Sequence, residues 1–307
     1  MSTNSDSAII DDAMNTTELT MFFLLNVTIV ILSNKKRQEI SRVIDALKYS
    51  EWLIVTLKRQ NVSYTNSVKK GVLKLATVKY GVIIILCIVD CVNIPEDRVD
   101  LITYYFSWSF HFLFELVIFA YFLILRSQYD ELNDFLLRQN FEITDHRTIQ
   151  NLIGAYSLLR KISKLVKSIS EVFILVKAIA DTIVTSVAVF YSLRMYSVLP
   201  DNLLLSTTSN ILYYALTAIS NFTLAYVFHD LLEKDELFMD HINRVLNSPT
   251  AAVTNFKKNT LFAVDNFLNK LEFLVCGLFP LDCTYICWMI TSVAGYVVYL
   301  VQLNKIT

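Results

Sequence analysis

The chain has 307 residues, of which 54 % are hydrophobic and only 18 % are charged, and its mean hydropathy is +0.47. Soluble domains contain about 45–50 % apolar and about 25 % charged residues, so this composition favours a membrane protein and excludes a disordered chain. A net charge of −1 gives no indication of nucleic acid as a partner. With 5 glycines and 4 prolines, the chain is poor in the turn residues that β-sandwiches and glycine-rich nucleotide folds need.

Long apolar stretches recur along the chain. A helix needs about 20 mostly apolar residues to cross the hydrocarbon layer. The first stretch, Leu19–Ser33, is shorter than this and needs its flanks to complete a crossing. The sequence therefore predicts an all-α fold, a polytopic membrane helical bundle with six spans. The other five spans are Val78–Ile94, Leu101–Leu125, Glu171–Leu199, Leu203–Leu231 and Leu281–Leu303.

The connections between these stretches alternate in length and charge. Asn34–Thr77 carries ten basic residues against three acidic ones, and Ser127–Ser170 and Glu233–Lys270 are also long. Pro95–Asp100 and Pro200–Asn202 are short and acidic. Basic connections stay in the cytoplasm, so the long connections are expected there and both termini outside.

The long connections are expected to be helical. Ile40, Val43, Ile44 and Leu47 have the spacing of one helix face, which predicts a cytoplasmic helix that buries an apolar stripe. The last span is expected to be broken, because Pro280 separates it from the apolar segment 271–279. The expected organisation is an extracellular tail (1–18), five membrane helices with cytoplasmic helical connections (19–270), a broken final helix (271–303) and an extracellular C-terminus (304–307).

The C-terminal stretch FLVCGLFPLDCTYICWMITSVAGYVVYLVQL resembles the signature region of insect gustatory receptors. That signature ends in Thr-Tyr, five hydrophobic residues and Gln-Phe; Tyr296, Val297–Val301 and Gln302 match it, whereas Gly295 replaces the Thr and Leu303 replaces the Phe. The preceding CGLFPLD is similar to that family's stretch before its last helix. The family has seven spans and a cytoplasmic N-terminus, so the resemblance implies that this chain is short by one span at its N-terminus.

The resemblance implies a taste receptor, which is not an enzyme and has no cofactor. It would be a subunit of a tastant-gated, non-selective cation channel, a homo- or heterotetramer with other gustatory receptors in the plasma membrane. A truncated non-conducting or modulatory subunit is one alternative, and a secondary transporter is another.

By the same resemblance, the final helix lines the pore. Gly295, Tyr299 and Gln302 lie at i, i+4 and i+7, on one helix face. Four Gln302 amides would form a ring at the outer mouth, and Tyr299 or Val298 would form a hydrophobic gate. Without the motif, periodicity alone favours a belt of Tyr296, Tyr299 and Gln302 at the membrane surface.

The resemblance also implies a small-molecule pocket in the outer half of the subunit. The third-span residues that would face it are Tyr104, Tyr105, Phe106, Trp108 and Phe110, with His111 and Glu115 as its polar groups. Aromatic walls with a few polar groups suit an organic ligand. The same aromatic residues are compatible with a belt that faces lipid.

Charged residues inside spans usually face the bundle interior, because lipid exposure is costly. Lys177 and Asp181 are four residues apart, which predicts an ion pair. His111 and Glu115 have the same spacing, which is compatible with a hydrogen-bonded pair or with a share in the ligand pocket. This spacing can also hold a metal ion, but without further ligands no metal site is expected.

Overall fold

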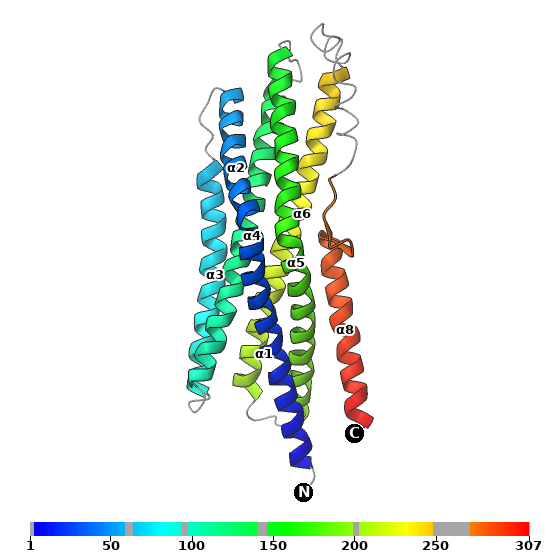
Figure 1. Ribbon diagram of the computed structural model, residues 1–307. Helices are drawn as coiled ribbons and strands as arrows, with labels where there is room; N and C mark the ends of the chain where they lie inside the picture. The colour runs from blue at the N-terminus through cyan, green and yellow to red at the C-terminus, as the bar shows by residue number, and fades with distance from the viewer. Residues whose placement is uncertain are drawn as a thin grey trace.

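The computed structural model describes residues 3–58, 64–93, 98–139, 146–198, 203–247 and 271–306. Both termini lie at the same end of an elongated helical bundle (Figure 1). The elements in chain order are α1 (Thr3–Lys35), α2 (Arg37–Lys58), α3 (Tyr64–Asn93), α4 (Arg98–Arg138), α5 (His146–Val198), α6 (Leu203–Asn247), β1 (Leu274–Val275), β2 (Phe279–Pro280) and α8 (Cys283–Ile306).

The all-α membrane bundle predicted from the sequence is confirmed. Within the described residues, five helical segments are long and apolar enough to cross a membrane; they lie in α1, α3, α4, α5 and α8. The fourth and fifth predicted spans lie in α5 and α6, which run in opposite directions. The end of α5 and the start of α6 lie at the end of the bundle that holds the termini (Figure 1). The five observed segments that are long and apolar enough are Thr16–Lys35, Val68–Val89, Trp108–Arg138, Arg147–Phe190 and Cys283–Gln302.

Three helices extend well beyond the length that a bilayer requires. α4, α5 and α6 have 41, 53 and 45 residues. At 1.5 Å per residue, α5 is about 80 Å long, against about 30 Å for the hydrocarbon layer. Their extensions pack together at the end of the bundle away from the termini, beside α2 (Figure 1). The predicted helical character of the long connections is thereby confirmed for these described parts.

The helix predicted from Ile40, Val43, Ile44 and Leu47 is α2. Val43 and Leu47 are buried and Ile40 is half-buried, whereas Ile44 lies at the margin of the stripe and is exposed. Backbone hydrogen bonds from Lys36 N to Leu32 O (2.8 Å) and from Ile40 N to Lys36 O (2.9 Å) make α2 almost a continuation of α1. The buried stripe of α2 packs mainly on α5.

A buried polar cluster joins the extensions of α4, α5 and α6. Tyr156 of α5 stacks on Phe238 of α6, with ring centroids 4.4 Å apart. Arg160 Nε lies 4.0 Å from Asp235 Oδ1, and Tyr129 packs edge-on against Tyr156. Burial raises the pKa of the Asp235 carboxyl above its usual value.

The segment before α8 is a β-hairpin, so the prediction of a broken helix over 271–279 is wrong. Leu274 pairs with Pro280 and Val275 with Phe279. The turn places Cys276 at φ 48° and Gly277 at φ 74°, left-handed values that a right-handed helix cannot contain. An apolar run of this length does not by itself distinguish a helix from a strand.

Candidate functional site

The first turns of α8 are firmly attached to the rest of the chain. Asp282 caps the helix by accepting a hydrogen bond from Thr284 N (2.8 Å). Leu281, Tyr285 and Met289 are buried on one face, against α5 and α6. The Phe279 ring of the hairpin stacks on the Tyr285 ring, with centroids 5.4 Å apart. The motif before the last helix thus forms the hairpin turn and the helix cap.

Further along α8, the residues predicted to line the pore lie on a surface that this chain leaves open. Val298 is 55 % exposed and Tyr299 is 54 % exposed, and Gly295 and Gln302 are exposed as well. No heavy atom lies within 4 Å of a Cβ built on Gly295. In one subunit, therefore, these four residues are available to lipid, to water or to another chain.

Four charged side chains are buried together in the middle of the bundle. Lys79 of α3 donates a hydrogen bond to Glu115 of α4 (Nζ to Oε1, 2.8 Å). Lys177 of α5 pairs with Asp181 one turn along the same helix, and its Nζ is 4.0 Å from Glu115 Oε2. All four are at most 7 % exposed, and their formal charges cancel. We call these residues the intramembrane charge cluster.

Two adjacent residues of α6 connect the two ion pairs. Ser220 hydrogen-bonds both Lys79, which donates to its Oγ (2.6 Å), and Glu115, which accepts from it. Asn221 accepts a hydrogen bond from Lys177 (3.0 Å) and donates one to Asp181 (2.8 Å). Buried charges are tolerated where such partners satisfy them.

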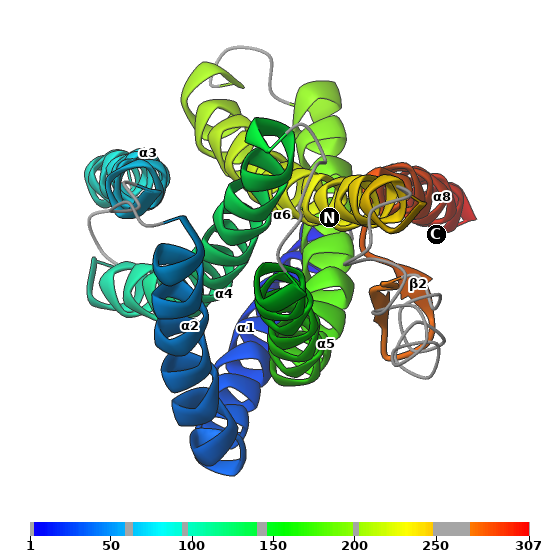
Figure 2. The ribbon, with the colours of Figure 1, turned by 90° about the horizontal axis from the view of Figure 1, so that it is seen from above.

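The network reaches α8 through one hydroxyl group. Tyr285 Oη donates to Asn221 Oδ1 over 3.4 Å, and both residues are 2 % exposed. Seen from above, α3 and α8 lie on opposite sides of the bundle, with α4, α5 and α6 between them (Figure 2). The polar network therefore runs from one side of the bundle to the other and contacts five helices within the described part of the chain.

The two spacing-based predictions have different outcomes. The Lys177–Asp181 ion pair is confirmed. The hydrogen-bonded His111–Glu115 pair is wrong: Glu115 is bound by Lys79 and Ser220, because neighbouring helices bring closer donors than its own helix does. His111 instead stacks on Phe22 of α1, with centroids 5.5 Å apart. Among the described residues, no group of three or more His, Cys, Asp or Glu side chains could hold a metal ion.

Of the aromatic residues predicted for a ligand pocket, Tyr105 and Trp108 form an aromatic ladder on α4 with Phe112, whereas Phe106 and Phe110 are exposed, so the prediction that they face a pocket is wrong. Tyr105 and Trp108 are 7 % and 2 % exposed, so they face the bundle and not lipid. Their rings lie 5.8 Å apart, and Trp108 continues the ladder to Phe112 at 5.3 Å. His111 and Glu115, also buried, follow below. The backbone of Tyr104 belongs to α4, but its side chain lies outside the described part.

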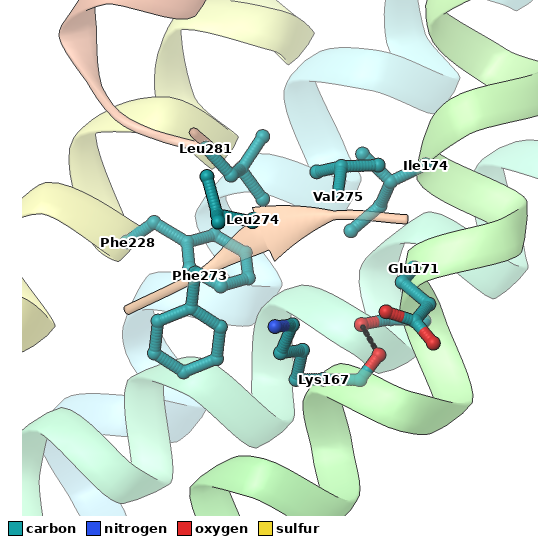
Figure 3. A pocket seen from close by; sticks show the side chains of 9 residues that line it. Lys167, Glu171, Ile174, Phe228, Phe273, Leu274, Val275 and Leu281 are labelled. Atoms are coloured by element: carbon teal, nitrogen blue, oxygen red, sulfur yellow. Dashed lines mark hydrogen bonds between the residues drawn. The ribbon is translucent and has the colours of Figure 1, made fainter. Parts of the chain in front are cut away.

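A small pocket lies elsewhere, between α5, α6 and the hairpin (Figure 3). Lys167, Ser170, Glu171 and Ile174 line its α5 side, and Phe228 lines its α6 side. The hairpin supplies the remaining apolar wall, from Phe273, Leu274, Val275 and Leu281. The residues that line the pocket also hold the hairpin against the bundle. For example, the Phe273 ring packs edge-on against the Phe228 ring, with centroids 4.9 Å apart.

Sequence reasoning missed four members of the network: Lys79, Ser220, Asn221 and Tyr285. Lys79 is the second residue of the predicted span Val78–Ile94, where a lysine looks like an ordinary flanking charge at the cytoplasmic surface. Ser220 and Asn221 look like ordinary small polar residues of a membrane helix, and tyrosines are common at membrane surfaces. Ser220 and Asn221 meet Tyr285 only because of how α6 and α8 are rotated relative to each other.

The comparisons with known proteins agree with this architecture. The family model of the 7tm chemosensory receptors matches residues 1–305. The chain is similar to the solved structure of the insect olfactory receptor OR5 from Machilis hrabei, with a TM-score of 0.68 and 11 % identity over 95 % of this chain and 81 % of that one. At this identity, the likeness shows the fold. No curated protein matches the chain. The match over almost the whole chain shows that this protein belongs to the 7tm chemosensory receptor family.

Proposed function

We propose that the chain is a gustatory receptor, a subunit of a tastant-gated, non-selective cation channel in the plasma membrane. The observation that carries this proposal is the open face of α8, on which Gly295, Val298, Tyr299 and Gln302 are exposed in the described part of the chain. A helix that is firmly held at one end and open along the other is suited to line a space shared with other subunits.

In the proposed assembly, four chains surround one axis, as a homotetramer or with other gustatory receptors. Both termini lie outside, so Gln302 is near the outer mouth. Carboxamide oxygens there replace part of a cation's hydration shell and still let the ion leave. Tyr299 or Val298 forms an apolar constriction that stops ions by excluding water, and a modest widening restores conduction.

The proposed ligand is a small organic tastant that enters from outside. The aromatic ladder of Tyr105 and Trp108, followed along α4 by His111 and Glu115, offers apolar walls and two buried polar groups, and Tyr104 of the same helix is proposed as a further lining residue. Such a combination orients a small molecule while burying most of its surface. The ladder lies on α4, which also carries Glu115 of the intramembrane charge cluster.

The proposal is tested by recording currents from the full chain in cells, alone and with other gustatory receptors, during application of a broad tastant panel. Gln302→Glu is expected to increase divalent-cation permeability and block in any active assembly, because it places acidic groups around the pore axis. Gln139→Glu, an exposed position at the end of α4 far from α8, is the charge-matched control. Unchanged permeation in Gln302→Glu contradicts pore lining, and silence in every combination favours a non-conducting or modulatory subunit.

A further inference from the structure

The pore helix has a specific polar attachment to the rest of the subunit. Within the described residues, the Tyr285 hydroxyl makes the side-chain hydrogen bond that joins α8 to another helix; the other polar side chains of α8 for which bonds are defined, Thr284 and Thr291, bond locally. Apolar contacts slide at little cost, whereas a hydrogen bond is lost when its atoms separate by about 1 Å. At 3.4 Å the Tyr285 bond is already long, so a small outward movement of α8 is enough to break it.

The acceptor of this bond has little freedom of its own. Asn221 Oδ1 also receives Lys177 Nζ at 3.0 Å, and its Nδ2 donates to Asp181 at 2.8 Å. With both ends of its amide occupied, Asn221 cannot rotate to follow a departing hydroxyl without releasing a buried charge. A displacement of α8 must therefore break the Tyr285 bond or disturb the Lys177–Asp181 pair.

The same network reaches the aromatic ladder on α4. Ser220 precedes Asn221 on α6 and hydrogen-bonds Glu115. Glu115 lies one turn from His111 and two from Trp108 on the same helix. A shift of α4 thus bears directly on Ser220 and, through the α6 backbone, on the adjacent Asn221 and its partner Tyr285. These contacts give a continuous physical connection between the ladder and the pore helix.

We propose that Tyr285 is a positioning residue that holds the pore helix in its resting place by bonding it to the intramembrane charge cluster. Movement of α8 during opening separates Tyr285 Oη from Asn221 Oδ1, so the bond favours the closed state. A ligand that shifts α4 weakens this hold through Glu115 and Ser220. The inference rests on the proposed channel function and adds to it the device that restrains the pore.

The first test removes only the hydroxyl. Tyr285→Phe keeps the ring that stacks on Phe279 and deletes the donor to Asn221. In an active assembly, we expect more current without ligand and a half-maximal tastant concentration about twofold to threefold lower, the low end of what one neutral hydrogen bond allows, because this bond is 3.4 Å long. Unitary conductance is expected to stay unchanged, because Tyr285 lies on the buried face of α8. Tyr226→Phe, which removes an exposed hydroxyl from α6, is the matched control.

The second test does not depend on conduction. Thermal unfolding of the purified full chain in detergent is measured for the wild type, Tyr285→Phe, Asn221→Ala and the double variant. If Tyr285 and Asn221 are coupled, the loss of stability in the double variant is smaller than the sum of the losses in the two single variants. Asn221→Ser replaces Asn221→Ala if the latter does not yield folded protein.

The two tests separate the possible failures. Additive effects on unfolding, or an unchanged half-maximal concentration in a conducting Tyr285→Phe assembly, overturn the inference. Coupled unfolding together with the concentration shift supports it. If the wild type conducts under no condition, the proposed channel function fails, while the unfolding cycle still decides whether Tyr285 and Asn221 act together.

Discussion

Helices α4 and α5 differ sharply from α8 in how far their own chain covers them. In the spans of α4 and α5, 50 % and 44 % of the most apolar window is buried, against 11 % in α8. The three helices have similar mean hydropathy in these windows, between 1.6 and 2.0. All three helices are therefore hydrophobic enough to cross a membrane. Hydrophobicity alone does not decide which of them form the core of the folded chain.

The difference lies in the partners along each helix. α4 and α5 have large side chains that meet each other and α6 along their length, such as Phe122 on Phe228 and Phe114 on Phe173. α8 has buried side chains at its hairpin end, and beyond Met289 the described side chains are exposed or half-buried. The body of the chain is thus stabilised from within, whereas the described residues bury little of α8 beyond Met289.

The largest effect on stability is expected from removing one charge of a buried ion pair. Glu115→Leu leaves Lys79 buried without its anion and is expected to destabilise the folded subunit by about 3–5 kcal/mol. The double variant Lys79→Met/Glu115→Leu removes both charges and is expected to recover most of this loss. Thermal unfolding of purified protein measures both, and Glu233→Leu, at an exposed position on α6, is the control.

A double variant as unstable as Glu115→Leu alone would show that the pair contributes more than mutual neutralisation. In that case the remaining contacts of Glu115, with Ser220 and Lys177, carry the difference. Such a result would make the body of the subunit more dependent on its polar network than on the aromatic contacts that surround it.

The all-α bundle and the helical character of its long connections follow from the sequence because they depend on local properties. Apolar length marks the spans, and the i, i+4 spacing of Lys177 and Asp181 needs no other helix to bring them together. The network around Asn221 does not follow, because its members come from five helices whose rotations are set by packing. Glu115 illustrates this: its own helix offers His111, but α3 and α6 offer better donors.

The hairpin shows a second limit of sequence reasoning. The run LVCGLFP is apolar enough for a helix, and Pro280 alone suggests a kink. The decisive features are backbone angles at Cys276 and Gly277, which composition does not reveal. The antiparallel pairing of Leu274 with Pro280 then turns the chain sharply into α8.

An intermediate effect is expected at this turn. Gly277 has a φ of 74°, and a Cβ added there meets no atom within 4 Å, so Gly277→Ala tests backbone strain alone. Left-handed conformation costs an L-residue about 1–2 kcal/mol, and the substitution is expected to destabilise the protein by about that amount. Gly154→Ala, in α5 with equally open space, is the matched control and is expected to stabilise, because alanine favours a helix. Thermal unfolding of both variants is the measurement, and equal signs would contradict the left-handed turn.

The smallest effect on stability is expected on the open face of α8. Val298→Ala removes two methyl groups from a side chain that is 55 % exposed, and the unfolding free energy of the single subunit is expected to change by less than about 0.5 kcal/mol. Val166→Ala makes the same truncation at a site on α5 that is 2 % exposed, and is expected to cost about 2 kcal/mol.

In an assembled, conducting protein, the two valine variants also distinguish α5 from α8 by their effect on current. If Val298 faces a shared pore, its truncation widens the constriction, so ligand-free current rises although the subunit is as stable as before. If Val298 faces lipid, neither stability nor current changes. A large loss of stability in Val298→Ala would mean that another part of the chain covers this face, and the separation between a self-sufficient body and an open final helix would then be wrong.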